Sequence, residues 1–383
     1  MIRDQQTLDL ILATVHRFVR DKLIPCEQEV AETDSIPPAI IDEMRAIGLF
    51  GLTIPEEYGG AGLTMEEEVQ VIIALTYASP AFRSILGTNN GIGSQGIVID
   101  GTPEQKAFWL PQLASGALIG SFALTEPGAG SDAASLATSA VRMDDHYVIN
   151  GTKRYITNAP EAGIFTVMAR TDASSTDSRG VSAFIVAANT PGITIGKIDR
   201  KMGQKGAHTA DVVFDNVKVP VANLIGGIEG QGFKTAMKVL DKGRITIAAV
   251  CVGAAQRLLD DALRYAQERI QFGQPIGQFQ LVQAMLADSR AELLAARSMV
   301  METARKRDAG ENVKIDAACC KLFASEMVGR VADRCVQIHG GAGYISDYAV
   351  ERFYRDVRLF RIFEGTSQIQ QLVIGRAMVL GET

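Results

Sequence analysis

The sequence predicts a multidomain α+β protein with helices at both ends and a β-domain between them. Apolar positions recur at helical spacing in residues 1–120, alternate with polar positions in short runs within residues 121–225, and recur at helical spacing again in residues 226–383. The length of 383 residues also exceeds what one simple core usually holds. We therefore expect an N-terminal helical domain at 1–120, a middle β-barrel or β-sandwich at 121–225 and a C-terminal helical bundle at 226–383.

The first domain is predicted to consist of amphipathic helices with defined ends. The apolar face of its first helix is formed by Leu8, Ile11, Leu12, Val15, Phe18 and Val19. A second helical run, residues 40–47, ends at Gly48, a residue type that commonly terminates helices. Thr64, followed three residues later by Glu67, predicts a capping box at the start of a further helix. Helical runs broken by glycine and proline are expected from there to residue 120.

The middle domain is predicted from short runs rich in β-branched and aromatic residues. An alternating run at 146–157 contains the pair Asn150-Gly151, which is typical of two-residue hairpin turns. We expect that hairpin and, after it, strands at 164–170, 181–187, 192–196 and 210–220. The β-domain is expected to close near Pro220.

The last domain is predicted to contain long helices. The helical runs cover residues 231–270, 279–308, 313–338 and 368–380, with joints at 273–277 and 340–343. The longest apolar run, Ile245–Ala255, is far too short to cross a membrane and predicts a buried helix.

The composition excludes several functional classes. With a net charge of −6 and no clustered basic excess, the chain lacks a surface typical of nucleic-acid binding. Residues 1–22 carry frequent charges and no unbroken apolar segment, so we expect neither a signal peptide nor a membrane anchor. Five cysteines without a CxxC pair indicate free thiols in a cytoplasmic protein, or in one of an organelle matrix. The four histidines are scattered, so no metal site is expected.

Two glycine motifs match known site signatures, but the chain lacks the neighbouring elements that those signatures require. GIGSQG at 91–96 matches the dinucleotide-binding pattern, yet its surroundings are helical and no βαβ unit follows. We interpret its glycines as positions of close packing. HGGAG at 339–343 resembles an oxyanion loop of some hydrolases, but the chain has no GxSxG nucleophile elbow. A hydrolase is therefore not expected.

The segment ALTEPGAGSDAAS (123–135) is a candidate anion-binding loop. Gly128 and Gly130 would let backbone N–H groups approach an anion, and Ser131 adds a hydroxyl. The segment lies at the predicted boundary between helices and β-domain, where ligand clefts often form. From these residues alone, an anion-binding loop and an ordinary Pro-Gly turn remain equally open.

Glu364 is the candidate for acid–base chemistry. It follows two apolar residues and precedes a helix that Thr366 or Ser367 can cap. A carboxyl group shielded by apolar neighbours has a raised pKa, which suits a general base. From this segment alone, a surface glutamate beside a helix cap is the simpler interpretation, and the rest of the chain reverses that preference.

Six segments together resemble the acyl-CoA dehydrogenases in order and spacing. They are ALTEPGAGSD (123–132), KRYITNA (153–159), KMGQKGAHTADVVFDNVKVP (201–220), RIQFGQPI (269–276), QIHGGAGY (337–344) and FEGTSQIQ (363–370). With LTIPEEYGGAGLT (52–64), the resemblance covers essentially the whole chain. Six ordered matches are far more specific than any one of them.

The resemblance implies a C-terminal four-helix bundle after the middle β-domain, a homotetramer built as a dimer of dimers, and FAD bound non-covalently between domains and partly across a subunit interface. Flavin and pyrophosphate contacts are implied for Phe122, Leu124, Thr125, Gly130, Ser131, Tyr155, Ile156 and Thr157. Contacts from a neighbouring subunit are implied for Arg269, Gln271, Phe272 and Gln280, contacts with the adenosine diphosphate end for Gln337, Gly340 and Gly341, and contacts beside the base for Thr366 and Gln368. Tyr155 stands where many members of the family have tryptophan.

The same resemblance places the catalytic base at Glu364. The implied reaction takes the α-proton of an acyl-CoA thioester while a β-hydride passes to the flavin, which yields a trans-2-enoyl-CoA, and electrons then pass to electron-transfer flavoprotein. The Glu364 backbone N–H and a flavin ribitol hydroxyl would stabilise the developing enolate. In one branch of the family the base stands instead at the position of Gly243, which has no side chain here. Further substrate contacts are implied for Ser131, Asp241, Arg244 and Gly365.

Arg83 bears on the identity of the substrate. Residues 79–90 match the far end of the acyl pocket and resemble glutaryl-CoA dehydrogenases, whose aligned arginine binds the distal carboxylate. A dicarboxylyl-CoA of glutaryl to pimeloyl length would then be the substrate. Alternatively, Arg83 pairs with Glu67 or Glu68, or points to solvent. At the two positions where glutaryl-CoA dehydrogenases carry serine and glutamate, this chain has Gly87 and Thr76. The resemblance therefore does not imply decarboxylation.

Three other functional classes remain open. A short- or medium-chain monocarboxylic acyl-CoA dehydrogenase would keep the chemistry without the role of Arg83. An acyl-CoA oxidase would pass electrons to oxygen, although such chains are commonly much longer. A non-enzymatic helical scaffold would have no need for Glu364 or for the flavin residues.

Overall fold

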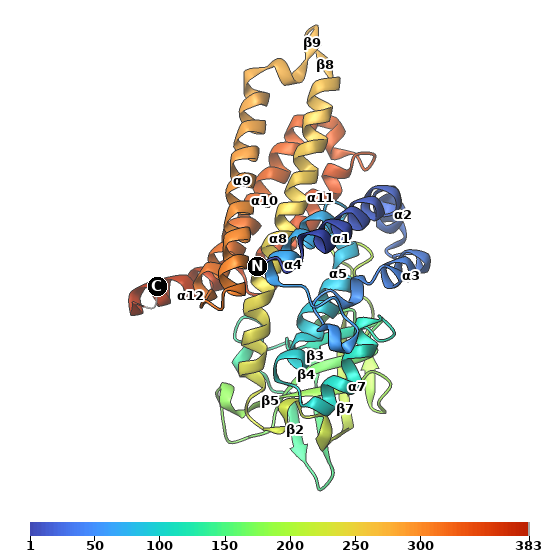
Figure 1. Cartoon of the computed structure of the whole chain (residues 1–383), viewed down its shortest axis with the longest axis vertical. Helices are drawn as coiled ribbons and strands as arrows, with labels where there is room; N and C mark the ends of the chain where they lie inside the picture. The colour runs from blue at the N-terminus through green and yellow to red at the C-terminus, as the bar shows by residue number, and fades with distance from the viewer. Residues whose placement is uncertain (382–383) are drawn as a thin grey trace.

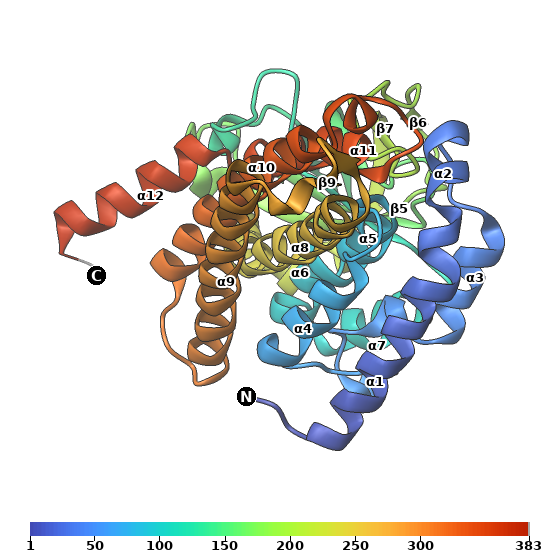
Figure 2. The same cartoon turned by 90° about the horizontal axis from the view of Figure 1, so that it is seen from above.

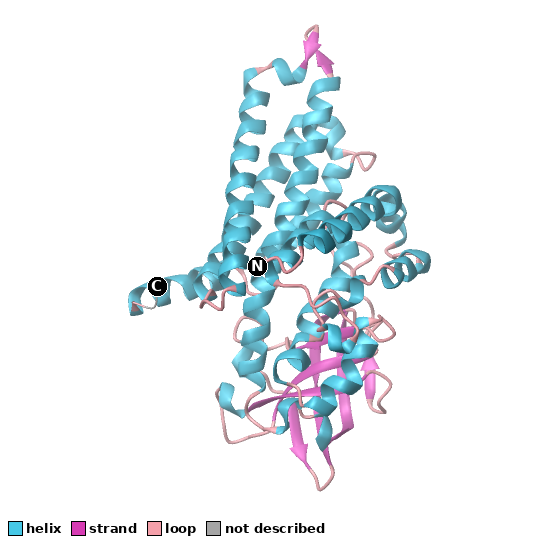
Figure 3. Cartoon of the chain, in the orientation of Figure 1, coloured by secondary structure: helices cyan, strands magenta, loops and turns pink. Residues whose placement is uncertain are grey.

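Helices surround one sheet in this protein, as the computed structural model shows for the residues that it describes, 1–381. Long C-terminal helices form the upper part of the molecule, the sheet forms the lower part, and the N-terminal helices lie along one side (Figure 1). The strands are gathered in the lower part, apart from a short hairpin at the top (Figure 3). The order of helices, sheet and helices confirms the predicted fold class.

The N-terminal region consists of helices with the predicted ends. They are α1 (Gln5–Phe18), α2 (Ile24–Thr33), α3 (Pro38–Ala46), α4 (Met65–Leu75), α5 (Pro80–Thr88), α6 (Gln95–Asp100) and α7 (Pro103–Ala114). The capping box of Thr64 and Glu67 is present at the start of α4. Gly48 follows α3 in the left-handed region with a φ of 77°, so the predicted stop is confirmed.

Of the glycines of GIGSQG, Gly93 serves close packing as interpreted from the sequence, whereas a Cβ atom at Gly91 would meet nothing within 4 Å and one at Gly96 only an ordinary contact at 3.5 Å. The segment follows α5 as a π-helical turn, Asn89–Gly93, and no strand precedes it. A Cβ atom at Gly93 would lie 2.9 Å from the carbonyl carbon of Gly120. The close neighbour is therefore the first strand of the sheet.

The middle region is a single connected sheet. Its strands are β1 (Gly120–Ala123), β2 (Ser139–Arg142), β3 (His146–Thr157), β4 (Ile164–Arg170), β5 (Val181–Ala187), β6 (Ile193–Ile195) and β7 (Thr209–Pro220). They are arranged in the order β1-β4-β2-β3-β7-β6, with β5 paired to β4. Phe165 of β4, Phe184 of β5 and Phe214 of β7 meet in one core, so the sheet curls around it. Strand β4 is buried on both faces, because Met168 points to a second core shared with α7 and α8.

The predicted hairpin at Asn150-Gly151 is wrong. Strand β3 continues through this pair and stays antiparallel to β7, with a register shift between Ile149 and Gly151. Glycine is needed there for another reason, since a Cβ atom at Gly151 would lie 2.4 Å from Thr138 Oγ1 of the neighbouring segment. The pair therefore marks a bulge at a close contact.

The C-terminal region is built from long helices. They are α8 (Gly232–Glu268), α9 (Gln280–Asp308), α10 (Lys314–His339), α11 (Ala349–Val357) and α12 (Ser367–Leu380), and the hairpin β8 (Ile270–Gln271) and β9 (Gln274–Pro275) joins α8 to α9. The sequence did not predict α11. Figure 2 shows α8 in the centre, between the N-terminal helices and α9–α10, while α12 projects away from the bundle.

Helix α8 organises the molecule. The predicted buried run, Ile245–Ala255, is enclosed along its whole length in a core that includes residues of α4, α9 and α10. Among residues 1–381, no helix is long and apolar enough to cross a membrane. Because α8 also starts against β5, where a Cβ atom at Gly232 would lie 2.2 Å from the Ser182 backbone, it connects all three regions.

Candidate active site

Glu364 lies in the short loop that precedes α12. Glu364 has a φ of 50° and Gly365 a φ of 88°, so two consecutive residues are in the left-handed region. That conformation costs a non-glycine residue about 1 kcal/mol or more, and it is found most often at functional sites. Thr366 then caps α12 by accepting a hydrogen bond of 3.2 Å from the Ile369 N–H.

The carboxyl group of Glu364 faces helix α8 at Gly243. A Cβ atom on Gly243 would lie 2.3 Å from Glu364 Oε2, so any other residue at this position would displace the carboxyl group. The Oε2 atom is buried and has no hydrogen-bond partner within the described part of the chain. The residue as a whole keeps some accessible surface. A buried carboxylate oxygen without a partner can accept a proton or a hydrogen bond from a ligand bound beside it.

Burial raises the pKa of Glu364 above the ordinary carboxyl range. Three cations act in the opposite direction, Arg83 most strongly, then Lys321 and then Arg244. We call these four side chains the base cluster. A carboxylate with a raised pKa binds a proton more tightly. It can therefore take a proton from a weak carbon acid more readily, as a general base must.

Helix α10 holds the loop of Glu364 from behind. The fully buried Lys321 donates a hydrogen bond of 2.6 Å to the Gly365 carbonyl. Glu326, further along α10, accepts a hydrogen bond of 2.7 Å from Ser367 Oγ and pairs at 3.1 Å with Arg361. Both ends and the middle of the loop are therefore attached to one rigid helix. Lys321 was not predicted as a site residue from the sequence, although a lysine within the apolar run of α10 was a possible signal.

We expect Lys321→Met to shift the pH dependence of the enzyme. Removing this cation takes away one of the charges that oppose the rise in the pKa of Glu364, so the base becomes ionised only at higher pH. A change of one pKa unit corresponds to about a tenfold lower kcat/KM on the acidic limb of the profile. The measurement is kcat/KM between pH 5.5 and 7.5, below the pKa of about 8 to which burial lowers Lys321.

The matched control is Lys306→Met, because Lys306 forms an ion pair with Asp316 at 2.9 Å at the molecular surface. That variant should keep the profile of the natural protein. An equal loss of kcat/KM at every pH in Lys321→Met would contradict an electrostatic role and leave only a structural one.

Arg83 extends from α5 into the base cluster. Its Nη2 lies 3.4 Å from Thr246 Oγ1 of α8, and its Nε is buried without a partner. The acids considered as partners are engaged elsewhere: Glu67 pairs with Arg3, and Glu68 lies 3.1 Å from Lys242. Burial lowers the pKa of Arg83, and Glu364 is the acid that most strongly opposes this. Arg83 therefore has no ion-pair partner among residues 1–381.

Residues 124–131 form an open loop on the sheet. Backbone hydrogen bonds in both directions between Glu126 and Ala129 close its turn and leave Gly130 and Ser131 exposed. The buried Lys153 supports the loop from below, with Nζ 2.7 Å from Glu126 Oε1 and 3.1 Å from the Leu124 carbonyl. Burial lowers the pKa of Lys153 to about 8. The pair of Lys153 and Glu126 was not predicted from the sequence.

Tyr155 is presented to solvent by an irregularity in β3. The register with β7 shifts between Lys153 and Ile156, and Tyr155 has a φ of 58°. Tyr155 as a whole residue is 65% exposed, whereas Ile156 next to it is buried. An exposed aromatic ring beside an open glycine loop fits the ring and phosphates of a dinucleotide such as FAD.

Several predicted flavin residues lie at the other end of the molecule. Arg269, Gln271 and Phe272 stand at the β8–β9 hairpin, which Figure 1 shows at the opposite end of α8 from the sheet. The stacking of Tyr265 on His339, at 4.4 Å between ring centroids, places Gln337 and the following glycines near the same end. Since α8 has 37 residues and is roughly 55 Å long, one chain does not bring the two groups together.

Asp241 and Arg244 form a pair on α8. Arg244 donates a hydrogen bond of 2.6 Å to Asp241, and its Nε is buried without a partner. Burial raises the pKa of Asp241, and the positive charge of Arg244 partly offsets this rise. The positive charge of Arg244 also acts on Glu364, so this pair borders the base cluster.

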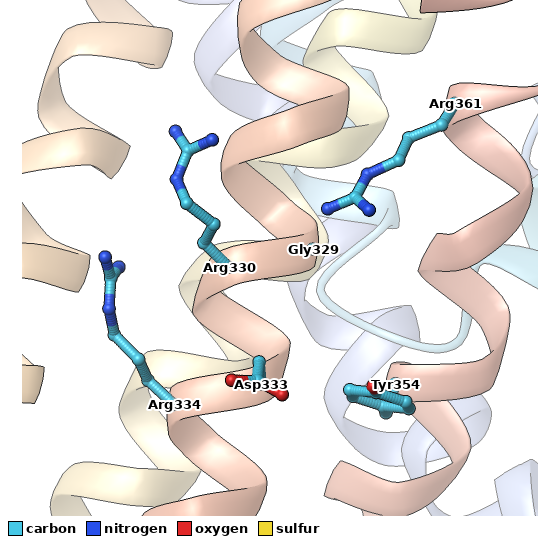
Figure 4. Close-up of a pocket in the computed structure, with 6 residues that line it drawn as sticks. All are labelled: Gly329, Arg330, Asp333, Arg334, Tyr354 and Arg361. Carbon is cyan, nitrogen blue, oxygen red and sulfur yellow. The ribbon is translucent and has the colours of Figure 1, made fainter.

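A hollow of about 370 Å³ lies between helix α10 and the chain segment that runs from α11 to Arg361 (Figure 4). It is lined by Gly329, Arg330, Asp333, Arg334, Tyr354 and Arg361. Arg330 and Arg334 both donate hydrogen bonds to Glu292 of α9, at 3.0 and 2.9 Å. Its arginines form ion pairs, Arg330 and Arg334 with Glu292 and Arg361 with Glu326, so the hollow joins helices α9 and α10 to the segment before α12.

Sequence models of acyl-CoA dehydrogenase domains match nearly the whole chain. The N-terminal domain matches residues 5–117, the middle domain residues 121–217 and the C-terminal domain residues 230–379. The chain belongs to the acyl-CoA dehydrogenase family. It is accordingly an oxidoreductase that acts on acyl-CoA with FAD as its cofactor.

Individual acyl-CoA dehydrogenases and related proteins support this assignment. The chain is 42% identical to an acyl-CoA dehydrogenase of Bacillus subtilis over 96% of both chains, and 42% identical to the caffeyl-CoA reductase-Etf complex subunit CarC of Acetobacterium woodii over 90% of this chain and 91% of that protein. The structure of butyryl-CoA dehydrogenase from Megasphaera elsdenii matches with a TM-score of 0.95 and 37% identity, covering 99% of this chain and all of that one. That of a glutaryl-CoA dehydrogenase in complex with glutaryl-CoA matches with a TM-score of 0.93 and 33% identity, covering 99% and 96%.

Proposed function

We propose that this acyl-CoA dehydrogenase oxidises a dicarboxylyl-CoA thioester, of glutaryl to pimeloyl length, to the trans-2-enoyl-CoA and passes the electrons to electron-transfer flavoprotein. Glu364 is the proposed base, and Arg83 binds the distal carboxylate. One observation carries the choice of substrate: the guanidinium of Arg83 lies in the base cluster without an ion-pair partner among the described residues.

The proposed roles of the protein groups follow from the loop of Glu364. The free Oε2 atom takes the α-proton of the thioester from its position beside Gly243 of α8. Within residues 1–381 the Glu364 N–H has no backbone acceptor, so it is available to the thioester oxygen as negative charge develops. FAD, when bound, would supply the acceptor for the β-hydride, which carries the two electrons. Glycine at 243 leaves Glu364 as the base at this site.

The residues that the family resemblance implies as FAD contacts fall into two sets in the proposed cofactor site. The loop at 124–131, Tyr155 and its neighbours, Thr366 and Gln368 would contact FAD in one subunit. Arg269, Gln271, Phe272, Gln280, Gln337, Gly340 and Gly341 would approach it from another subunit. The exposure of Phe272 at 94% and of Tyr344 at 89% supports burial of that end of the bundle by a second copy. A homotetramer built as a dimer of dimers would satisfy this arrangement.

Arg83 favours a carboxylate over an apolar acyl tail. A guanidinium can hold a carboxylate through two parallel hydrogen bonds. An apolar tail beside it would instead leave a desolvated cation without a partner, at a cost of several kcal/mol. The likeness to the glutaryl-CoA dehydrogenase complex supports this choice, and the likeness to butyryl-CoA dehydrogenase supports the rival short-chain monocarboxylic substrate.

The proposed electron acceptor follows from the family resemblance. The relative named as a subunit of a reductase-Etf complex supports a partnership with electron-transfer flavoprotein. An oxidase would instead reduce oxygen directly. Oxygen consumption with substrate alone separates the two, because a dehydrogenase should be nearly inactive without an added acceptor.

A substrate panel tests the proposed function. The purified yellow holoenzyme is assayed with an artificial electron acceptor and with butyryl-, hexanoyl-, glutaryl-, adipyl- and pimeloyl-CoA. We expect the highest kcat/KM for a dicarboxylyl-CoA, at least about tenfold above butyryl-CoA, which corresponds to about 1.4 kcal/mol. A higher kcat/KM for butyryl- or hexanoyl-CoA would assign the enzyme to monocarboxylic substrates.

A further inference from the structure

Arg170 is the last residue of strand β4 and lies beside the chain segment that contains the open loop. Its backbone is fixed by the sheet, because Arg170 pairs with Val181 of β5 and with Ser139 of β2. Its N–H also donates a hydrogen bond of 2.7 Å to the Thr138 carbonyl, where the loop segment enters β2. The guanidinium therefore extends from a position that two neighbouring strands hold in place.

The guanidinium of Arg170 donates all its hydrogen bonds to backbone carbonyls. Two of them reach the end of the loop segment, from Nη2 to Ala134 at 2.7 Å and from Nε to Leu136 at 3.3 Å. Two more reach the loop between β4 and β5, from Nη1 to Ser175 at 2.7 Å and to Asp177 at 3.0 Å. Among residues 1–381, no carboxylate accepts a hydrogen bond from this side chain. An arginine with this set of partners holds peptide groups in a defined orientation, a use that its fork of five donors suits.

The neck of the same loop is closed by Glu126. Its Oε2 accepts a hydrogen bond of 2.7 Å from the Ala137 N–H, and its Oε1 accepts one of 3.0 Å from the Thr138 N–H. Lys153 neutralises this carboxylate and also binds the Leu124 carbonyl. Both ends of the loop are therefore fixed, and their carbonyls are bound to cations of the sheet.

The middle of the loop keeps its N–H groups free. Gly130 and Ser131 are exposed, and within residues 1–381 neither N–H donates a hydrogen bond. Free N–H groups on a loop can bind an anion such as a phosphate. Since residues 127–133 include no lysine or arginine, the loop itself attracts an anion only through its backbone and its hydroxyl group. The conformation of that backbone then decides the affinity.

We propose that Arg170 is a positioning residue for FAD: by holding two carbonyls at the end of the loop, it presents the N–H groups of Gly130 and Ser131 to the diphosphate of the cofactor. The inference rests on the proposed placement of FAD at this loop. It adds a residue that is not among the contacts implied by the family resemblance. Without the guanidinium, the two carbonyls lose their donors, and the loop must be ordered again when FAD binds, at a cost in affinity.

The test compares Arg170→Met with the natural holoenzyme. Free FAD, followed by its fluorescence as each purified holoenzyme is diluted, gives the Kd of the cofactor. We expect this Kd to rise by about tenfold or more in Arg170→Met, whereas kcat at saturating FAD should stay within about twofold of the natural value. Arg170→Lys keeps the charge but donates fewer hydrogen bonds, so its Kd should rise less. A purely structural role would instead lower kcat at every FAD concentration.

The matched control is Arg179→Met. Arg179 belongs to the loop between β4 and β5, is exposed and pairs with Asp177 at 2.7 Å, so this variant should keep the natural Kd. An unchanged Kd in folded Arg170→Met would overturn the role of Arg170. If that variant does not fold, an unchanged Kd in Arg170→Lys would have the same consequence.

A variant of the loop itself tests the placement on which the inference rests. A Cβ atom at Gly130 would meet nothing within 4 Å, so Gly130→Asp adds a negative charge without a clash. It should raise the Kd for FAD, because the new charge repels the diphosphate. An unchanged Kd in Gly130→Asp would overturn the placement of FAD at this loop, and the inference with it. The dicarboxylyl substrate is tested separately, by the substrate panel.

Discussion

Replacement of Glu364 by glutamine should lower kcat/KM by about 10²- to 10⁴-fold, the usual contribution of a positioned general base. Glutamine has the shape of glutamate, so it fits against Gly243, but its amide does not accept the α-proton. The substitution removes no hydrogen bond accepted by Oε2, because this atom has no partner within residues 1–381. The measurement is single-turnover flavin bleaching by the best substrate of the panel.

Two controls distinguish loss of the base from loss of structure. Glu57→Gln, at an exposed glutamate of the N-terminal region, should retain full activity. Glu364→Gln should keep its flavin absorbance and still bind the acyl-CoA. Full turnover in Glu364→Gln would show that another group takes the proton.

If Glu364 is the base, its ionisation should also determine how kcat/KM of the natural enzyme depends on pH. A base works when it is deprotonated, so kcat/KM should rise with pH through the pKa of Glu364 and level off above it. Burial raises that pKa, and hence the rise should occur above the ordinary carboxyl range. In Glu364→Gln this limb should be absent.

Arg83→Ala should cause the second large effect, a loss that depends on the substrate. Truncating one partner of a buried charge pair costs about 2–5 kcal/mol. We therefore expect kcat/KM for the preferred dicarboxylyl-CoA to fall by about 30-fold or more. The value for butyryl-CoA should fall less, because it loses only the effect of Arg83 on the pKa of Glu364. The measured quantity is the ratio of the two kcat/KM values.

Stability offers an independent check on Arg83. Its Nε is buried without a partner, and burial lowers its pKa, so the free enzyme is not stabilised by this charge. Arg83→Ala should leave the melting temperature of the substrate-free holoenzyme unchanged or higher. Arg83→Lys keeps the charge but not the paired hydrogen bonds, so its selectivity should be intermediate. Equal losses on both substrates, together with a lower melting temperature, would assign Arg83 a structural role.

Local sequence signals were reliable where the structure depends on neighbours along the chain. The capping box of Thr64 and Glu67, the strands at 164–170 and 181–187, and the buried run of α8 were all predicted, because they follow from side-chain period and backbone hydrogen bonding over a few residues. The same kind of signal failed at Asn150-Gly151. There a local turn preference lost to the pairing of β3 with β7 and to the contact with Thr138.

In the candidate site, too, features set by neighbours along the chain were predictable from the sequence, and features set by long-range packing were not. The motif around Glu364 and its cap was visible in the sequence, because loop, glycine and helix start are consecutive. Lys321 was not, since 43 residues separate it from Glu364 and only the packing of α10 brings its Nζ to the Gly365 carbonyl. The proximity of Arg83 to the base also required the crossing of α5 and α8, which no spacing along the chain encodes.

The amino-acid order thus sufficed for the fold class, the family and the proposed proton acceptor, since each is carried by short contiguous patterns. The packing of α5, α8 and α10 decided which charges surround that carboxyl group and how far from it Arg83 lies. Electrostatic energy depends on distance and burial, and both quantities arise only when segments remote in the chain are brought together.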